Sequence, residues 1–318
     1  MSNYDNPEFM ELYEMSKKEV LKQGRAMAVA NKMAKVSGKR CNLKLDGRDV
    51  EIVYYPALAE DGTEIPNAPL LVGYHGGGFI FGGCALDDSV WVNTVKTLGV
   101  NVASVGYRMA PEYMWQESLA DAYDAALYLR DHAKDFGFDA NHISLIGSSA
   151  GATLVASVAL KAKEEGTITF DNQILIYPFL DLYTDPDSKG EGNFIGPICY
   201  VMNDLHCSHE DAKLPLVSPV YATKEMLEGL PNAIFAICEK DNLRHEGLKY
   251  SKMLEEAGVH VSQILCEQMP HGFFEVGFRK PTAFDYDFLG ENSKEILDNG
   301  TLSKWAYKTL DFIKENLK

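Results

Sequence analysis

The chain has 318 residues, of which 46% are hydrophobic and 24% charged, the composition of an ordinary globular protein. Its formal net charge of −16 argues against nucleic-acid binding, which depends on cationic groups that neutralise phosphates. The N-terminal segment lacks the pattern of a secretory signal, no apolar run approaches the roughly 20 residues of a membrane helix, and the six cysteines are scattered. We therefore expect a cytoplasmic protein without a membrane span and with reduced thiols.

Apolar strand-like segments alternate with helix-like segments along most of the chain. Helical periodicity predicts helices over 7–37, 87–98, 117–136, 150–164 and 302–316. Short apolar runs predict strands at 48–55, 69–75, 100–107, 142–148, 173–179, 232–240 and 259–267. This alternation favours an α/β fold with a mostly parallel central sheet and helices on both faces. Sites in such sheets form at the carboxyl ends of the strands.

The stretch 182–230 breaks this alternation, because prolines and glycines recur through it. An excursion of that length inside a compact domain is usually functional. We expect it to form a helical cap together with 1–40, over an α/β core made of 41–181 and 231–318. Aromatic and apolar cap side chains are expected to cover a pocket: Phe9, Tyr13, Phe194, Ile195, Tyr200 and Met202.

The motif G-x-S-x-G occurs at Gly147–Gly151. It lies directly after one predicted strand and directly before a predicted helix. In that setting a serine is held on a strained turn with its hydroxyl directed away from the sheet, and the helix N-terminus favours developing negative charge. The motif therefore predicts Ser149 as a nucleophile. The alternative is a glycine-rich connection with incidental serines.

Three consecutive glycines, Gly76–Gly78, follow His75 at the end of the strand predicted at 69–75. Such a run lets backbone N–H groups approach a ligand closely. Donors aimed at a tetrahedral oxyanion contribute about 3–4 kcal/mol each. The alternative is a flexible loop or a phosphate-binding loop, but neither G-K-[ST] nor G-x-G-x-x-G follows, so the run favours an oxyanion hole.

A serine nucleophile needs a base and an orienting carboxylate. His271 follows the last predicted strand, and Asp241 follows the strand predicted at 232–240. Together with Ser149 they give the chain order serine, acid, histidine that an α/β-hydrolase uses. Asp181 also follows a predicted strand and is the competing acid.

A metal site is only weakly suggested. His206, His209 and Glu210 lie close together, but their spacing is not H-E-x-x-H and they fall in the predicted cap. We expect no metal and no cofactor, since acyl transfer by a serine triad requires neither.

Taken together, the motifs resemble the hormone-sensitive-lipase-like esterases, a branch of the α/β-hydrolases. The matching segments follow the family order: HGGGF (75–79), YRMAPE (107–112), GSSAG (147–151), YP (177–178), DNLRHEG (241–247) and HGF (271–273). The resemblance implies Asp241 as the acid and the N–H groups of Gly77, Gly78 and Ala150 as the oxyanion hole. Four residues depart from the family pattern and blur the subgroup: Ser148, Ala152, Asn242 and His245.

The sequence thus predicts a serine carboxylesterase acting on small, short-chain acyl esters, with Ser149, Asp241 and His271 as its triad. Candidate pocket walls are Phe79, Phe81, Trp115, Phe179 and Tyr200, of which Phe79 and Tyr200 are expected to bind substrate. The alternatives are an amide or N-formyl hydrolase with the same triad and a non-catalytic ligand receptor on this fold. The insertion 281–300 is expected to border the site or a subunit contact, which leaves a homodimer open.

Overall fold

The computed structural model describes residues 3–59, 61–190, 196–282, 285–286 and 294–317. Its centre is an eight-stranded sheet in the order β1-β2-β4-β3-β5-β6-β7-β8. The strands are β1 (Lys39–Leu45), β2 (Arg48–Tyr55), β3 (Leu70–Tyr74), β4 (Asn101–Gly106), β5 (Ile143–Ser148), β6 (Asn172–Ile176), β7 (Asn232–Lys240) and β8 (Val261–Pro270). Strands β3 to β8 are parallel, whereas β2 pairs antiparallel with both β1 and β4. The predicted, mostly parallel α/β sheet is confirmed.

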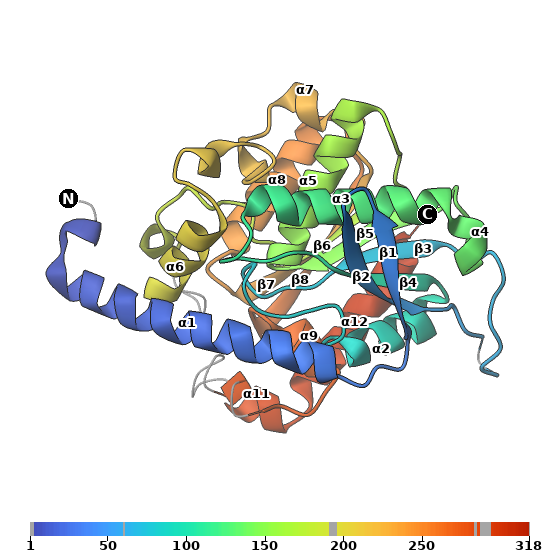
Figure 1. The fold of residues 1–318 in the computed structure, drawn as a ribbon, viewed down its shortest axis with the longest axis horizontal. Helices are drawn as coiled ribbons and strands as arrows, with labels where there is room; N and C mark the ends of the chain where they lie inside the picture. The colour runs from blue at the N-terminus through green and yellow to red at the C-terminus, as the bar shows by residue number, and fades with distance from the viewer. Residues whose placement is uncertain (1–2, 60, 191–195, 283–284, 287–293, 318) are drawn as a thin grey trace.

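Helices cover both faces of this sheet (Figure 1). The longer ones are α1 (Pro7–Met33), α2 (Asp88–Leu98), α3 (Trp115–Asp131), α5 (Ala150–Glu165), α6 (Pro197–His206), α8 (Arg244–Glu256) and α12 (Thr301–Asn316). The shorter ones are α4 (Ala133–Phe136), α7 (Lys224–Leu227), α9 (Phe273–Gly277) and α11 (Lys294–Asp298). Helices α3, α5 and α8 lie on one face, and α2, α9 and α12 lie on the other.

Two buried apolar clusters explain why the strands are continuous apolar runs. Leu70 and Val72 of β3 belong to the cluster under α3 and α5, whereas Leu71 between them belongs to the cluster with α2 and α12. Successive side chains of a strand point to opposite faces, so a sheet that is covered on both sides needs apolar residues at every position.

Several observed elements differ from the predicted ones. The helix predicted over 7–37 ends at Met33, because Ala34 has an extended backbone. The helix predicted over 117–136 is divided into α3 and α4 at His132, which leaves the helical conformation. Strand β8 continues to Pro270, so His271 follows it directly. The bounds of the edge strand β1 and of helices α6, α7, α8, α9 and α11 were not predicted.

Helix α1 runs along one side of the molecule beside α6 (Figure 1). The hydroxyls of Tyr4 and Tyr13 both donate to Oδ2 of Asp204, each at 2.8 Å. Asn3 Nδ2 donates to the hydroxyl of Tyr200 at 2.6 Å. The segments 1–40 and 182–230, which the sequence pairs as a cap, therefore pack against each other. Phe194 and Ile195 lie outside the described residues, as does much of the insertion 281–300.

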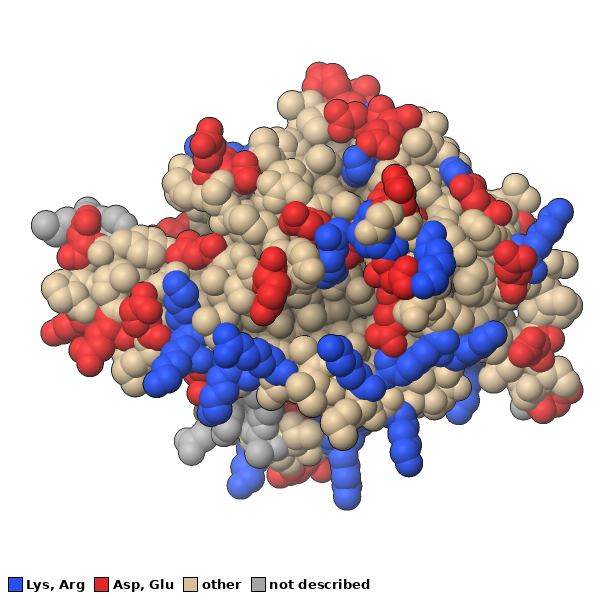
Figure 2. All heavy atoms as spheres, in the orientation of Figure 1, with Lys and Arg blue, Asp and Glu red and all other residues tan. Residues whose placement is uncertain are grey.

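The charged side chains are unevenly distributed over the surface. On the face shown in Figure 2, acidic side chains are scattered, whereas lysine and arginine side chains gather along α1 and below it. Across the described parts of the chain, no helix combines the length and the apolar character needed to cross a bilayer.

Candidate active site

Ser149 lies on a tight turn between β5 and α5, the predicted strand–turn–helix setting. Its φ of 52° and ψ of −121° are costly for a residue other than glycine. The turn packs closely, because a Cβ on Gly151 would overlap the carbonyl of Tyr74 and a Cβ on Gly147 would overlap the carbonyl of Gly151. The N–H of Ser149 donates to the carbonyl of Ile176 at 2.9 Å. The surrounding structure thus holds a strained serine in place.

The side chains of Ser149, Asp241 and His271 meet at the carboxyl ends of β5, β7 and β8. His271 Nε2 lies 2.8 Å from Ser149 Oγ, and His271 Nδ1 lies 2.7 Å from Asp241 Oδ2. Asp241 Oδ1 also accepts the N–H of Leu243 at 2.9 Å, which fixes the carboxylate. A carboxylate can only accept, so the proton of a neutral imidazole sits on Nδ1 and leaves Nε2 to accept from the serine hydroxyl. All three side chains are buried.

Asp181, the competing acid, lies elsewhere. Its Oδ1 accepts the N–H groups of Tyr183 at 3.1 Å and Thr184 at 2.8 Å, and its Oδ2 accepts the Thr184 hydroxyl at 2.7 Å. The hydroxyl of Tyr221 donates to the same carboxylate at 3.2 Å. These bonds cap the turn that follows β6. The structure therefore brings Asp241, rather than Asp181, to the imidazole of His271.

The glycine loop after β3 lies against the serine turn. A Cβ on Gly76 would lie 3.5 Å from the Cβ of Ser149. Gly77 and Gly78 have φ of 117° and 59°, which glycine adopts without a steric penalty. Among the described residues, no acceptor is recorded for the N–H groups of Gly77, Gly78 or Ala150. The oxyanion hole expected from these three donors stays a prediction.

His75 anchors this loop. Burial lowers the pKa of His75 to about 4, so the ring is neutral at pH 7. Nδ1 lies 2.8 Å from the carbonyl of Gly76, and the ring stacks on Tyr107 at 4.3 Å between centroids. The hydroxyl of Tyr107 in turn donates to the carbonyl of His75 at 2.7 Å. The side chains of His75 and Tyr107 thus fix the conformation of the glycine loop.

The predicted pocket residues lie in different surroundings. Phe79 and Phe179 are fully buried, and Phe79 stacks on His206 at 3.5 Å between centroids. The hydroxyl of Tyr200 donates to Asp185, and its ring packs edge-on against Phe9 of α1. Phe81 and Trp115 are partly exposed. Substrate contact by Phe79 and Tyr200 stays a prediction.

The suggested metal cluster is not assembled in the described part of the chain, where no group of three potential ligands is found. His206 packs on Phe79, whereas His209 packs against Tyr183 at 5.0 Å between centroids. Burial lowers the pKa of His206 to about 3, which keeps its ring neutral. The two histidines thus have separate aromatic partners.

A pocket of about 240 Å³ lies beside the loop that carries Asp241. Its lining consists of Asp181, Thr184, Ser188, Lys189, Asn242, His245, Glu246 and Lys249. Lys189 Nζ lies 3.3 Å from Glu246 Oε2 and 4.8 Å from the ring centroid of Phe179. Burial outweighs the nearby lysine and raises the pKa of Glu246 to about 8. Sequence reasoning missed this pair: Glu246 was visible only as part of the DNLRHEG motif, and no motif contains Lys189.

Comparison with known proteins decides the family. Residues 71–275, which include Ser149, Asp241 and His271, match the family described as alpha/beta hydrolase fold. The chain belongs to that family. An arylesterase from Saccharolobus solfataricus is 30% identical over 244 residues, which cover 74% of this chain and 77% of the relative. An ethyl acetate hydrolase from Pseudomonas putida is 28% identical over 239 residues, which cover 73% and 74%.

A solved esterase structure has a similar fold. The thermostable esterase from Pseudomonas putida ECU1011 superposes with a TM-score of 0.74 at 25% identity, over 96% of this chain and 92% of that one. The predicted resemblance to the hormone-sensitive-lipase-like esterases is confirmed by these relatives. This α/β-hydrolase is a carboxylic ester hydrolase.

Proposed function

We propose that this carboxylic ester hydrolase cleaves small, short-chain acyl esters by two acyl transfers through Ser149. The observation that carries the proposal is the pair of hydrogen bonds that joins Ser149 Oγ to His271 Nε2 and His271 Nδ1 to Asp241. A nucleophile, a base and an orienting acid in hydrogen-bond contact are what serine acyl transfer requires.

In the first step Ser149 Oγ attacks the ester carbonyl while His271 Nε2 takes its proton. Asp241 holds the ring and stabilises the imidazolium. The N–H groups of Gly77, Gly78 and Ala150 stabilise the oxyanion of the tetrahedral intermediate. As the intermediate collapses, His271 returns the proton to the departing alcohol. Water, deprotonated by the same imidazole, then attacks the acyl-enzyme and frees the acid and Ser149.

The proposal of small substrates rests on the relatives and on the space around the glycine loop. The name of one relative, an ethyl acetate hydrolase, refers to a small ester. A Cβ on Gly78 would overlap Sδ of Met202 in α6, so α6 lies directly over the loop. We infer that 1–40 and 182–230 form a cap that limits acyl length, over a core made of 41–181 and 231–318.

We also infer a cytoplasmic enzyme without a nucleic-acid partner. None of the six cysteines, all of which lie in the described part of the chain, is in a disulfide, and five of them are buried, which suits a reducing compartment. The net charge of −16 opposes binding to a polyanion.

The test is Ser149→Ala, assayed with nitrophenyl esters from acetyl to decanoyl beside the matching anilides. We expect kcat for esters to fall by roughly three orders of magnitude or more while the circular dichroism spectrum is unchanged. Retention of more than about a tenth of the wild-type kcat would refute the nucleophile. Faster turnover of anilides than of esters would favour the amide hydrolase. Failure of an organophosphonate to label the wild type would favour a receptor.

A further inference from the structure

Behind the serine turn, one carboxylate joins two elements that flank the triad. Glu275 lies on α9, four residues after His271. Its Oε1 accepts the hydroxyl of Ser148, and its Oε2 accepts the hydroxyl of Tyr177. Ser148 directly precedes Ser149, and Tyr177 directly follows β6. Both oxygens of Glu275 are thus engaged by segments more than ninety residues away in the chain.

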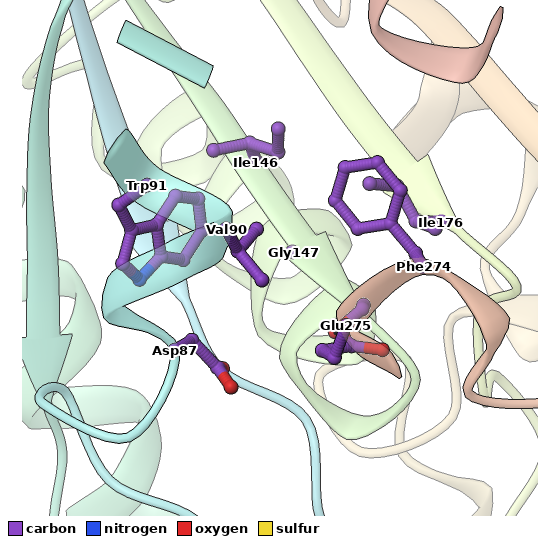
Figure 3. Close-up of a pocket in the computed structure, with 9 residues that line it drawn as sticks. Asp87, Val90, Trp91, Ile146, Gly147, Ile176, Phe274 and Glu275 are labelled. Atoms are coloured by element: carbon purple, nitrogen blue, oxygen red, sulfur yellow. Dashed lines mark hydrogen bonds between the residues drawn. The ribbon is translucent and has the colours of Figure 1, made fainter. Parts of the chain in front are cut away.

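Glu275 borders a small cavity that lies behind the turn and is shown in Figure 3. The lining residues are Asp87, Val90, Trp91, Ile146, Gly147, Ser148, Ile176, Phe274 and Glu275. The cavity measures about 10 Å³, room for one water molecule at most, so it is too small for an ester. The partly buried carboxylate of Glu275 therefore does not line a substrate-sized pocket.

A second acid reaches the same cavity from the start of α2. Burial and the charge of Glu275 raise the pKa of Asp87 to about 7, against the opposing effect of Arg279. Below neutral pH, Asp87 is therefore mostly protonated, which lowers the repulsion between the two acids. The Glu275 carboxylate meets two hydroxyl donors here, those of Ser148 and Tyr177.

The bonds of Glu275 reach both ends of the Ser149–His271 contact. On the serine side, the Ser148 hydroxyl fixes the residue next to the nucleophile. On the histidine side, the Tyr177 ring packs against the imidazole of His271 at 4.8 Å between centroids. Glu275 and the base His271 also lie on the same short segment, 271–275. A shift of this carboxylate would therefore alter the position of the imidazole relative to Ser149 Oγ.

We propose that Glu275 is a positioning residue for the ester hydrolysis, which holds the serine turn and the histidine loop in register. The proposal rests on the proposed triad, since Glu275 acts through its bonds to Ser148 and Tyr177. A carboxylate suits the role because both of its partners are hydroxyl donors and it offers only acceptors. A glutamine would replace one acceptor oxygen by an NH₂ donor. Only its carbonyl oxygen could then accept a hydrogen bond in place of the two carboxylate oxygens.

The experiment compares two tyrosine variants that each remove one buried hydroxyl. Tyr177→Phe breaks a bond to Glu275. The matched control is Tyr54→Phe, because the Tyr54 hydroxyl on β2 lies 2.9 Å from Asn101 Oδ1 on β4, three strands away from β6 in the sheet. Glu275→Gln is measured beside them, alone and combined with Tyr177→Phe. For each variant, kcat and KM for a nitrophenyl ester, the rate of organophosphonate labelling and the urea unfolding midpoint are determined.

We expect Glu275→Gln to lower kcat on the order of 10- to 100-fold with KM within about twofold, because misplacing a reacting group by about 1 Å costs about that much. Labelling by the organophosphonate should slow in parallel. Tyr177→Phe should lower kcat by a smaller factor, and the double variant should lose less than the product of the two single losses. Tyr54→Phe should lose stability with kcat unchanged.

A folded Glu275→Gln enzyme with kcat within twofold of wild type would overturn the proposal. Should Glu275→Gln fail to fold, Tyr177→Phe decides: a kcat equal to that of Tyr54→Phe overturns the proposal, and a selective loss supports it. Ser149→Ala run in parallel separates the two hypotheses. If Ser149→Ala keeps its activity, the triad itself is wrong. If Ser149→Ala is inactive while the Glu275 variants are fully active, only the positioning role is wrong.

Discussion

The buried carboxyl of Glu246 predicts a measurable dependence of stability on pH. Glu246 lies on α8 and is almost fully buried, and its Oε1 has no hydrogen-bond partner among the described residues. Its Oε2 lies 3.3 Å from Lys189 Nζ, yet burial dominates and raises the pKa of Glu246 to about 8. The change we consider is Glu246→Gln, which keeps the shape of the side chain and removes its ionisation.

The sign follows from the direction of this pKa change. Glu246 binds its proton more tightly in the folded chain than in the unfolded one, whose carboxyl has the ordinary value of 4.5. Its contribution to stability is therefore fully present below about pH 4.5 and is lost as the pH rises through about 8. At 1.36 kcal/mol per pKa unit, the gap of 3.5 between 8 and 4.5 sets an upper limit of about 5 kcal/mol. About 4 kcal/mol of that falls between pH 5 and pH 9.

The assay is urea unfolding of the wild type and Glu246→Gln at unit steps from pH 5 to pH 9. Subtracting the two curves cancels all other titrating groups, so the difference isolates Glu246. Relative to the wild type, Glu246→Gln should gain up to about 4 kcal/mol as the pH rises. The exposed Glu228→Gln serves as the control and should run parallel to the wild type. Parallel curves for Glu246→Gln as well would refute the reasoning, and so would a relative loss of stability at high pH.

Three further predictions concern the site. The value of kcat/KM should rise with pH in a stopped-flow ester assay, because only the neutral imidazole of His271 can take the serine proton; a rate independent of pH from about 5 to 9 would exclude a histidine base. Gly151→Ala should lower the free energy of unfolding by about 1–3 kcal/mol, since its Cβ would overlap the carbonyl of Tyr74, and an unchanged urea midpoint would contradict this. Met202→Ala should shift the acetyl-to-octanoyl ratio of kcat/KM several-fold towards octanoyl, and an unaltered ratio would mean that α6 does not limit acyl length.

The parts of the fold that could be predicted are those whose burial appears in the local sequence. Every residue of β3 is buried, so its apolar run is continuous. The edge strand β1 was missed because its only buried side chain is Leu43. Helix α8 was missed because it begins within the DNLRHEG motif and presents a largely polar sequence. Elements such as β1 and α8 have too few apolar residues in a regular spacing to be predicted from hydrophobic periodicity.

The active site also contains residues that the sequence predicts and residues that it does not. Ser149 could be predicted because the turn that holds it is formed by its own neighbours in the sequence. His271 is 122 residues from Ser149, but the chain order of the fold indicates it. The roles of Glu275 and Lys189 could not be predicted, since they follow from contacts with residues 127 and 57 positions away that no motif records. Only the packed structure reveals such contacts.

The contact between Ser148 and Glu275 also gives a physical reason for one departure from the family pattern. The family more often has an acidic residue or threonine at position 148, where this chain has serine. Here the carboxylate behind the turn is supplied by α9, and Ser148 supplies a hydroxyl donor to it. An aspartate at position 148 would bring a further negative charge to a cavity that already contains Glu275 and Asp87. Like charges at such short range cannot all ionise, so one acid would be kept protonated. The identities of residues 148 and 275 are therefore energetically linked, and a serine at 148 supplies a donor to Glu275 without adding a further acid to the cavity.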